Sequence, residues 1–147
     1  MANIAVDKDT LIDLPDGYTP SSSEEFMNAM QREYFRRKLL TWRAELVAES
    51  GETMMHLQED THNEPDDADR ASSETDRSIE LRTRDRERKL IAKIDSALQR
   101  IKEQNYGYCE ETGDPISLAR LEARPIATLT IEAQERHERM EKTYTDE

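Results

Sequence analysis

Apolar side chains recur at alternating four- and three-residue steps in two long stretches of the chain. In the first stretch these positions are Phe35, Leu39, Trp42 and Leu46. In the second stretch they are Leu90 or Ile91, then Ile94, Leu98 and Ile101. This spacing puts an apolar stripe on one face of a helix, where it can pack against a partner helix. The pattern therefore predicts two long helices that bury their stripes against each other.

The first predicted helix begins just after Pro20 and continues towards Asp60. Residues 21–25 read Ser-Ser-Ser-Glu-Glu, and a serine followed three residues later by a glutamate is the signature of a capping box. No proline interrupts the following stretch until Pro65. A helix of roughly 35–38 residues is expected, which at about 1.5 Å per residue would reach about 50–55 Å.

The second predicted helix begins near Ser72 and ends before Asn105 and Gly107, so it roughly matches the first in length. About ten polar residues join the two helices, and this arrangement predicts an antiparallel hairpin with its tip at residues 61–71. We therefore divide the chain into an N-terminal arm (1–27), a coiled-coil hairpin (28–104), a turn-rich region (105–130) and a C-terminal helix with a tail (131–147). Within the turn-rich region one helical turn is expected at Leu118–Arg124, and Thr130 is expected to cap the last helix.

The composition agrees with long solvated helices, since 37% of the residues are charged and only 35% are hydrophobic. The formal net charge of −12 opposes binding to a phosphate backbone, so we expect no direct DNA binding. The chain has no basic, apolar leader and no run of about 18 apolar residues, so a soluble cytoplasmic protein with no membrane contact is expected.

Carboxylates gather at the predicted tip, where Asp66, Asp67 and Asp69 follow Pro65. They could form a solvated turn in which Asp69 caps the second helix, or they could act at the end of a rod that probes a narrow cavity. A calcium loop is disfavoured because the central glycine and terminal glutamate of an EF-hand are missing. Residues 82–89 indicate a helix surface of mixed charge, and the three histidines show no convincing ligand spacing.

Several blocks of sequence, in this order and at these spacings, resemble the DksA family. They are residues 35–37, 42–43, 65–71, 80–82, 84–91, 106–109 and 121–125. The resemblance implies a mainly α protein with a long antiparallel coiled-coil hairpin on a small globular base, and no enzymatic activity.

In function, the resemblance implies a transcription factor that binds bacterial RNA polymerase with its hairpin in the secondary channel. Asp66, Asp69 and Ala71 match the family's tip residues, which act at the polymerase active centre, and Arg86 matches an arginine associated with polymerase docking. The family represses ribosomal RNA promoters and activates some amino-acid biosynthesis promoters.

Family members act together with the alarmone ppGpp. Leu90, Lys93 and Arg124 match the positions that contact it, and cationic side chains suit its phosphates. Gln134 stands where other members can have a lysine, which puts the affinity for ppGpp in doubt.

The best-known members carry four zinc-binding cysteines, and the matching positions here are Cys109, Thr112, Thr130 and Ala133. Threonine hydroxyls are poor zinc ligands, so the sequence predicts a degenerate, zinc-independent region with no zinc expected. We expect this region to be held by apolar packing of Tyr106, Tyr108, Ile116, Leu118, Leu121 and Leu129.

Two other functional classes stay open at this point. A relative of the Gre factors would also carry an acidic coiled-coil tip but would assist transcript cleavage through a recruited metal ion. A structural coiled-coil adaptor would not bind polymerase at all. For the polymerase-binding factor we expect a monomer.

Overall fold

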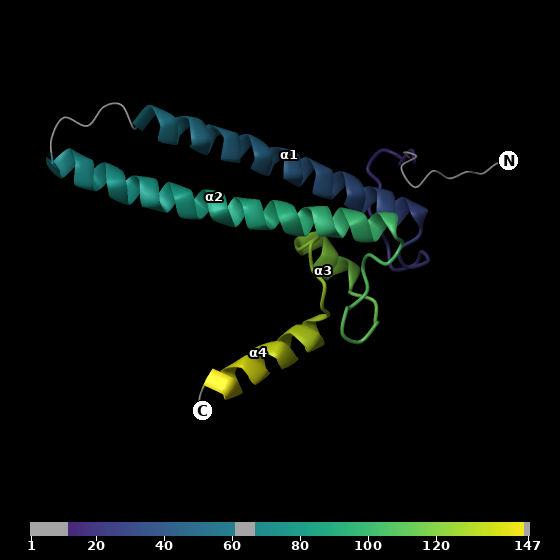
Figure 1. The fold of residues 1–147 in the computed structure, drawn as a ribbon. Coiled ribbons are helices and arrows are strands. Elements are labelled where there is room, and N and C mark those ends of the chain that lie inside the picture. The colour runs from purple at the N-terminus through teal and green to yellow at the C-terminus, as the bar shows by residue number, and fades with distance from the viewer. Residues whose placement is uncertain (1–11, 61–66, 146–147) are drawn as a thin grey trace. The chain divides into compact units, whose positions relative to one another are not determined.

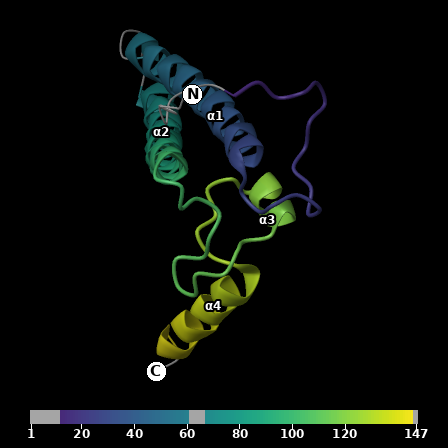
Figure 2. The same cartoon turned by 90° about the vertical axis from the view of Figure 1, so that its right-hand side faces the viewer.

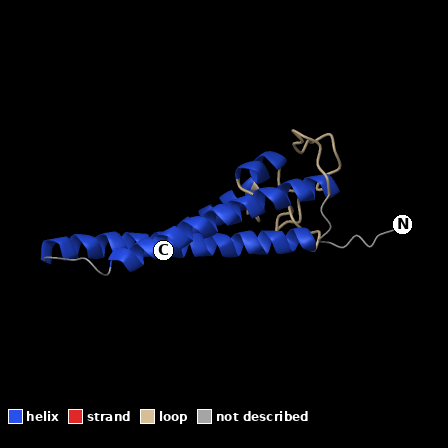
Figure 3. Ribbon diagram, turned by 90° about the horizontal axis from the view of Figure 1, so that it is seen from above, coloured by secondary structure: helices blue, strands red, loops and turns tan. Residues whose placement is uncertain are grey.

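The computed structural model describes residues 12–60 and 67–145, without the side chains of residues 52–71 and 144–147. Four helices occur in this part of the chain (Figures 1 and 3): α1 (Ala29–Asp60), α2 (Asp67–Lys102), α3 (Leu118–Ala123) and α4 (Ile131–Thr145). The predicted mainly α fold class is confirmed. No helix of the described residues is long and apolar enough to cross a membrane.

The chain forms two compact units. The first unit contains Met1–Leu39 and Ser96–Glu147, and the second contains Leu40–Asp95. The second unit holds most of α1 and α2, whereas the first unit holds the helix ends, α3, α4 and the connecting loops.

In the second unit α1 and α2 run antiparallel and side by side, which confirms the predicted hairpin (Figure 1). Leu46 is 7% exposed and Ile94 is fully buried, as their place in the apolar stripes predicts, and Trp42 is half-buried. Arg43 forms an ion pair across the two helices, with its Nε 2.6 Å and its Nη2 3.3 Å from the two carboxylate oxygens of Asp95.

The seam of the hairpin becomes polar along α2 from Ile94 towards its N-terminus. The same three- and four-residue steps lead from Ile94 through Leu90 to Glu87 and Thr83. Glu87 is only 8% exposed, and its Oε2 has no hydrogen-bond partner among the described residues. The apolar stripe therefore does not extend over the whole hairpin.

The start of each long helix differs from its prediction. Residues 21–24 form an isolated turn, in which the Glu24 carboxylate accepts a hydrogen bond from the Ser21 amide at 2.9 Å. Met27 then takes a positive φ of 53°, and Asn28 caps α1 by accepting a hydrogen bond from the Gln31 amide at 2.9 Å. Helix α2 begins at Asp67 rather than Ser72.

The first unit has an apolar core built from α1, the loop after α2, and α3. Phe35, Tyr106, Ile116 and Leu121 are fully buried, which confirms the predicted packing of the last three. The ring centroids of Phe35 and Tyr106 lie 5.7 Å apart. The Tyr106 hydroxyl donates a hydrogen bond to the Pro125 carbonyl at 2.7 Å.

The other residues of the predicted packing set are less buried. Leu118 and Leu129 are half-buried, and Tyr108 is 39% exposed. The ring of Tyr108 takes part in apolar packing at its edge, because it meets the Phe26 ring edge to face, with centroids 5.4 Å apart.

Candidate functional site

The acidic tip lies at the boundary of the described residues. Asp66 is outside them, and Asp69 and Ala71 lie in the first turns of α2 with side chains that are not described. Because α2 begins at Asp67, Asp69 is inside the helix and is not its cap. The role of these three residues at the tip stays a prediction.

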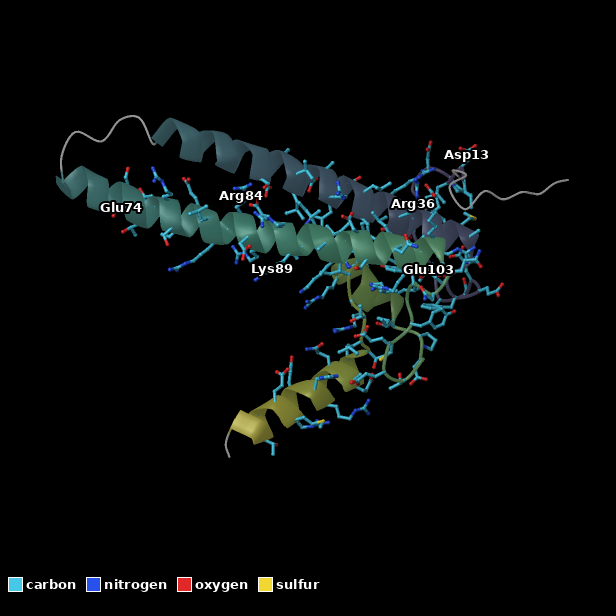
Figure 4. All side chains as sticks on the ribbon, viewed as in Figure 1. Asp13, Arg36, Glu74, Arg84, Lys89 and Glu103 are labelled. Atoms are coloured by element: carbon cyan, nitrogen blue, oxygen red, sulfur yellow. The ribbon has the colours of Figure 1, made fainter. Side chains whose placement is uncertain are left out.

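Cationic side chains follow one face of α2 within the second unit. Arg82, Arg86, Lys89 and Lys93 succeed one another at steps of four, three and four residues, and all four are exposed. Figure 4 shows Lys89 on the side of α2 that points away from α1, where its Nζ lies 3.4 Å from Asp85. Leu90 is half-buried beside this face. Such a face can pair with carboxylates or phosphates.

Arg124 belongs to the first unit, where it ends α3. Its backbone amide donates a hydrogen bond to the Arg120 carbonyl at 2.7 Å, and its side chain is exposed. Gln134, the other position linked with ppGpp, is half-buried and donates a hydrogen bond to Glu138 at 3.2 Å. Leu90 and Lys93 lie in the second unit, so their proposed cooperation with Arg124 is left as a prediction.

The loop after α2 lies in the first unit (Figure 2). Residues 109–114 of this loop form a tight turn, the knuckle. The Cys109 amide donates to the Asp114 carbonyl at 2.8 Å, and the Gly113 amide donates back to the Cys109 carbonyl at 2.9 Å. A further hydrogen bond, from the Glu110 amide to the Thr128 carbonyl at 2.9 Å, connects the knuckle to the segment before α4.

Cys109 is the first residue of this knuckle and is 3% exposed. Burial raises the pKa of its thiol, but hydrogen bonds from the Thr112 side chain and from neighbouring backbone groups lower it more, to about 7. The Thr130 hydroxyl lies 3.9 Å from Cys109 Sγ and also accepts the Ala133 amide at 3.2 Å, as the predicted cap of α4. The four positions Cys109, Thr112, Thr130 and Ala133 thus belong to one local structure.

An ionic contact that the sequence did not suggest joins the knuckle to α4. The Glu111 carboxylate lies against His137 Nε2, and its other oxygen is 3.8 Å from Arg136 Nη2. Glu111 and His137 are 26 positions apart, so no local pattern could have indicated the pair.

A second such network holds α3 to α1. Tyr34 donates a hydrogen bond to Glu122 at 2.6 Å, and Lys38 Nζ lies 2.8 Å from the same carboxylate oxygen. Partial burial and the bond to Glu122 raise the pKa of Tyr34 to about 12.

Two family models match the chain. "DnaK suppressor protein DksA, N-terminal domain" matches residues 31–101, and "Prokaryotic dksA/traR C4-type zinc finger" matches residues 104–139.

Named relatives cover most of the chain. The RNA polymerase-binding transcription factor DksA of Caulobacter vibrioides (strain NA1000 / CB15N) is 64% identical over 130 residues, 88% of this chain and 92% of the relative. The protein of the same name from Escherichia coli K12 is 46% identical over 85% of this chain and 83% of the relative. The structure of transcription factor DksA2 from Pseudomonas aeruginosa aligns with a TM-score of 0.76 at 44% identity, covering 84% of this chain and 93% of that one.

The match to a C4-type zinc finger contradicts our prediction of a zinc-independent protein with no zinc expected. It points to zinc binding by this part of the chain, and we correct the prediction accordingly. The side chains present do not supply four thiolates, however, because Cys109 is the single cysteine. Among the described residues no group of three or more His, Cys, Asp or Glu could hold a metal ion.

Proposed function

The chain belongs to the DksA family, and from this we propose that it binds bacterial RNA polymerase directly and regulates transcription initiation without catalysing a reaction itself. The observation that carries the proposal is the long hairpin. Helix α1 has 32 residues and α2 has 36, so they would span about 48 Å and about 54 Å at about 1.5 Å per residue. Helices of this length suit a narrow, deep channel.

In this proposal the hairpin enters the secondary channel of the polymerase, and Asp66, Asp69 and Ala71 act near its active centre. Carboxylates at a hairpin tip can alter the position of groups around the active centre by charge and hydrogen bonding, without a covalent step. The expected result is a shorter lifetime of open complexes, which represses ribosomal RNA promoters and helps some amino-acid biosynthesis promoters.

Docking would use the cationic face of α2. Arg86 is exposed in the middle of this face, so its guanidinium can reach carboxylates on another protein. The net charge of −12 supports contact with a protein rather than with DNA. We propose that the protein acts as a cytoplasmic monomer.

We also propose that ppGpp binds through Leu90, Lys93 and Arg124. Lys93 and Arg124 are exposed cations, and Leu90 offers an apolar contact. Gln134 adds no charge to this set, so the dependence on ppGpp should be weaker than in a member that has a lysine there.

The test is single-round transcription from a ribosomal RNA promoter, with and without ppGpp, comparing the intact protein with Asp69→Asn. Asp76→Asn is the matched control, because Asp76 is an exposed aspartate further along the same helix. We expect Asp69→Asn to bind polymerase normally but to lose repression, while Asp76→Asn keeps it.

Equal repression by Asp69→Asn would remove the tip mechanism. Shortening of the nascent RNA in stalled complexes would favour a Gre-like cleavage factor. If the intact protein did not bind polymerase, the proposal would be wrong and a structural coiled-coil adaptor would be favoured.

A further inference from the structure

The backbone of Arg124 is held on both sides, although its side chain is exposed. Before it, the short helix α3 is anchored by Leu121, which is fully buried in the core of the first unit. After it, the Pro125 carbonyl accepts a hydrogen bond from the Tyr106 hydroxyl at 2.7 Å. The Arg124 carbonyl accepts the Ala127 amide at 3.0 Å. A cation on a fixed backbone loses less conformational freedom when it pairs with an anion.

A third anchor of α3 is charged and lies at the surface. Glu122, two positions before Arg124, accepts hydrogen bonds from the Tyr34 hydroxyl at 2.6 Å and from Lys38 Nζ at 2.8 Å, both at the same carboxylate oxygen. Tyr34 and Lys38 lie one turn apart on α1, so two successive turns of that helix hold α3. The side chains of Glu122 and Lys38 are 45% and 35% exposed, so solvent reaches this anchor, unlike the other two.

The same contacts determine which charge Arg124 has beside it. An unpartnered carboxylate two positions away would repel a phosphate bound to Arg124 and would compete for its guanidinium. Lys38 supplies a compensating positive charge and, together with Tyr34, keeps the Glu122 carboxylate bound to α1. The surroundings of Arg124 therefore depend on two side chains of another helix.

We infer that Tyr34 and Lys38 are positioning residues for the response to ppGpp, and that they act through Glu122 on the place and the electrostatic surroundings of Arg124. The inference rests on the proposed function, in which Arg124 contacts ppGpp. Neither Tyr34 nor Lys38 needs to touch ppGpp, because each acts on the carboxylate that precedes Arg124 by two positions. Their contribution is to hold Arg124 ready to pair with the phosphates.

The experiment is single-round transcription from a ribosomal RNA promoter with purified RNA polymerase and a titration of ppGpp. The readout is the ppGpp concentration that gives half of the additional repression. Lys38→Met removes the charge but keeps the aliphatic stem, and Tyr34→Phe removes the hydroxyl but keeps the ring. We expect each to raise this concentration by about two- to fivefold, the range of an exposed polar contact. Repression without ppGpp should stay within about twofold of that by the intact chain.

Matched controls make the same chemical changes elsewhere in the first unit. Lys142→Met removes an exposed lysine from α4, and Tyr18→Phe removes a hydroxyl that donates to Glu24 at 3.0 Å. Both should respond to ppGpp as the intact chain does. Lys38→Arg keeps a cation beside Glu122 and should keep the response.

A double-mutant cycle tests whether Lys38 acts through Glu122. The effect of Lys38→Met should shrink in a Glu122→Gln background, because the carboxylate that Lys38 neutralises is then absent. An effect of the same size in both backgrounds would overturn the inference. Circular dichroism checks that each variant keeps its helices, and Lys38→Gln replaces Lys38→Met should the latter unfold.

Arg124→Ala separates the inference from the proposed function. If Arg124→Ala weakens the ppGpp response while Lys38→Met and Tyr34→Phe do not, the inference fails and the proposed function stands. If Arg124→Ala leaves the response unchanged, or the intact chain does not respond to ppGpp, the proposed ppGpp site and the inference both fail. An equal loss of repression with and without ppGpp in Lys38→Met and Tyr34→Phe would show a purely structural role and would also overturn the inference.

Discussion

Gly107 has a backbone conformation and surroundings that other residues do not fit. Its φ is +92°, and a Cβ at this position would lie 2.8 Å from Met27 Cε and 3.3 Å from Phe26 Cζ. Met27 is 5% exposed, so its methyl group has little room to move. Gly113, in the same loop, has a φ of +77° but open space around it. Substituting Gly107 and Gly113 in turn therefore separates the cost of backbone strain from the cost of a steric clash.

Gly113→Ala should lower the free energy of unfolding by about 1–2 kcal/mol, the cost of a left-handed conformation for a residue with a Cβ. Gly107→Ala should cost at least about 1 kcal/mol more, because the new methyl group also overpacks the contact with Met27. Urea denaturation of both variants measures the difference. Equal losses would show that the neighbours of Gly107 adjust without cost.

Glu122 makes the stability of the first unit depend on pH. Partial burial raises the pKa of this carboxyl, but the hydrogen bonds from Lys38 and Tyr34 and the charge of Lys38 lower it more, to below its usual value. A lowered folded-state pKa means that the stabilisation is present at neutral pH and is lost as the pH falls through that pKa.

Glu122→Gln should therefore lower the free energy of unfolding at neutral pH by up to about 1 kcal/mol, as expected for an exposed ion pair. The difference from the wild type should shrink as the pH is lowered from about 5 to about 3. Denaturation curves at several pH values, with Glu135→Gln as the control, measure it. A difference that stays constant with pH would contradict the assignment.

Among the elements, the two long helices were predictable because their stripes repeat over several turns. The residues at which these helices begin were not predictable, because a capping motif in the sequence can also close an isolated turn. The capping-box residues Ser21 and Glu24 close an isolated turn, and Asn28 provides the actual cap after the positive φ of Met27. Ala97 is fully buried although the apolar stripe did not identify it, since a small side chain gives a weak signal.

The polar seam around Glu87 predicts an unusual response to mutation. Glu87→Leu should raise the stability of the hairpin by about 1–2 kcal/mol, because it replaces a buried carboxylate with an unpartnered oxygen by a side chain that suits the seam. Asp85→Leu is the control on the exposed side of α2, where the ion pair with Lys89 contributes only a few tenths of a kcal/mol. Thermal unfolding followed by circular dichroism compares them, and a loss of stability in Glu87→Leu would refute this reading of the seam.

For the whole molecule, the net charge and the family could be predicted from the sequence, whereas contacts between distant segments could not. The net charge can be read directly, and so can the family resemblance, which the family models confirm. The contact between Glu111 and His137 could not be predicted, because it depends on how the knuckle and α4 pack. A cavity lined by Phe26, Leu118 and Ile131 escaped prediction for the same reason, since three separate segments form it. The zinc prediction failed because it weighed ligand side chains and not the family of the domain.

The net charge of −12 predicts no measurable binding to duplex DNA at an ionic strength of about 0.15 M. Fluorescence anisotropy of a labelled promoter fragment, titrated with the protein in the absence of polymerase, is the measurement. Binding whose affinity falls steeply with added salt would reveal a DNA-binding surface and contradict this expectation.

The half-buried position of Trp42 in the hairpin has a practical consequence for spectroscopy. It is the chain's single tryptophan, so intrinsic emission excited at its absorption edge reports on the second unit alone. Tyr106 lies in the first unit, where burial raises the pKa of its phenol, but it is one of five tyrosines, so phenolate absorbance does not single it out. The single tryptophan thus allows the opening of the hairpin to be followed by itself, without any attached label.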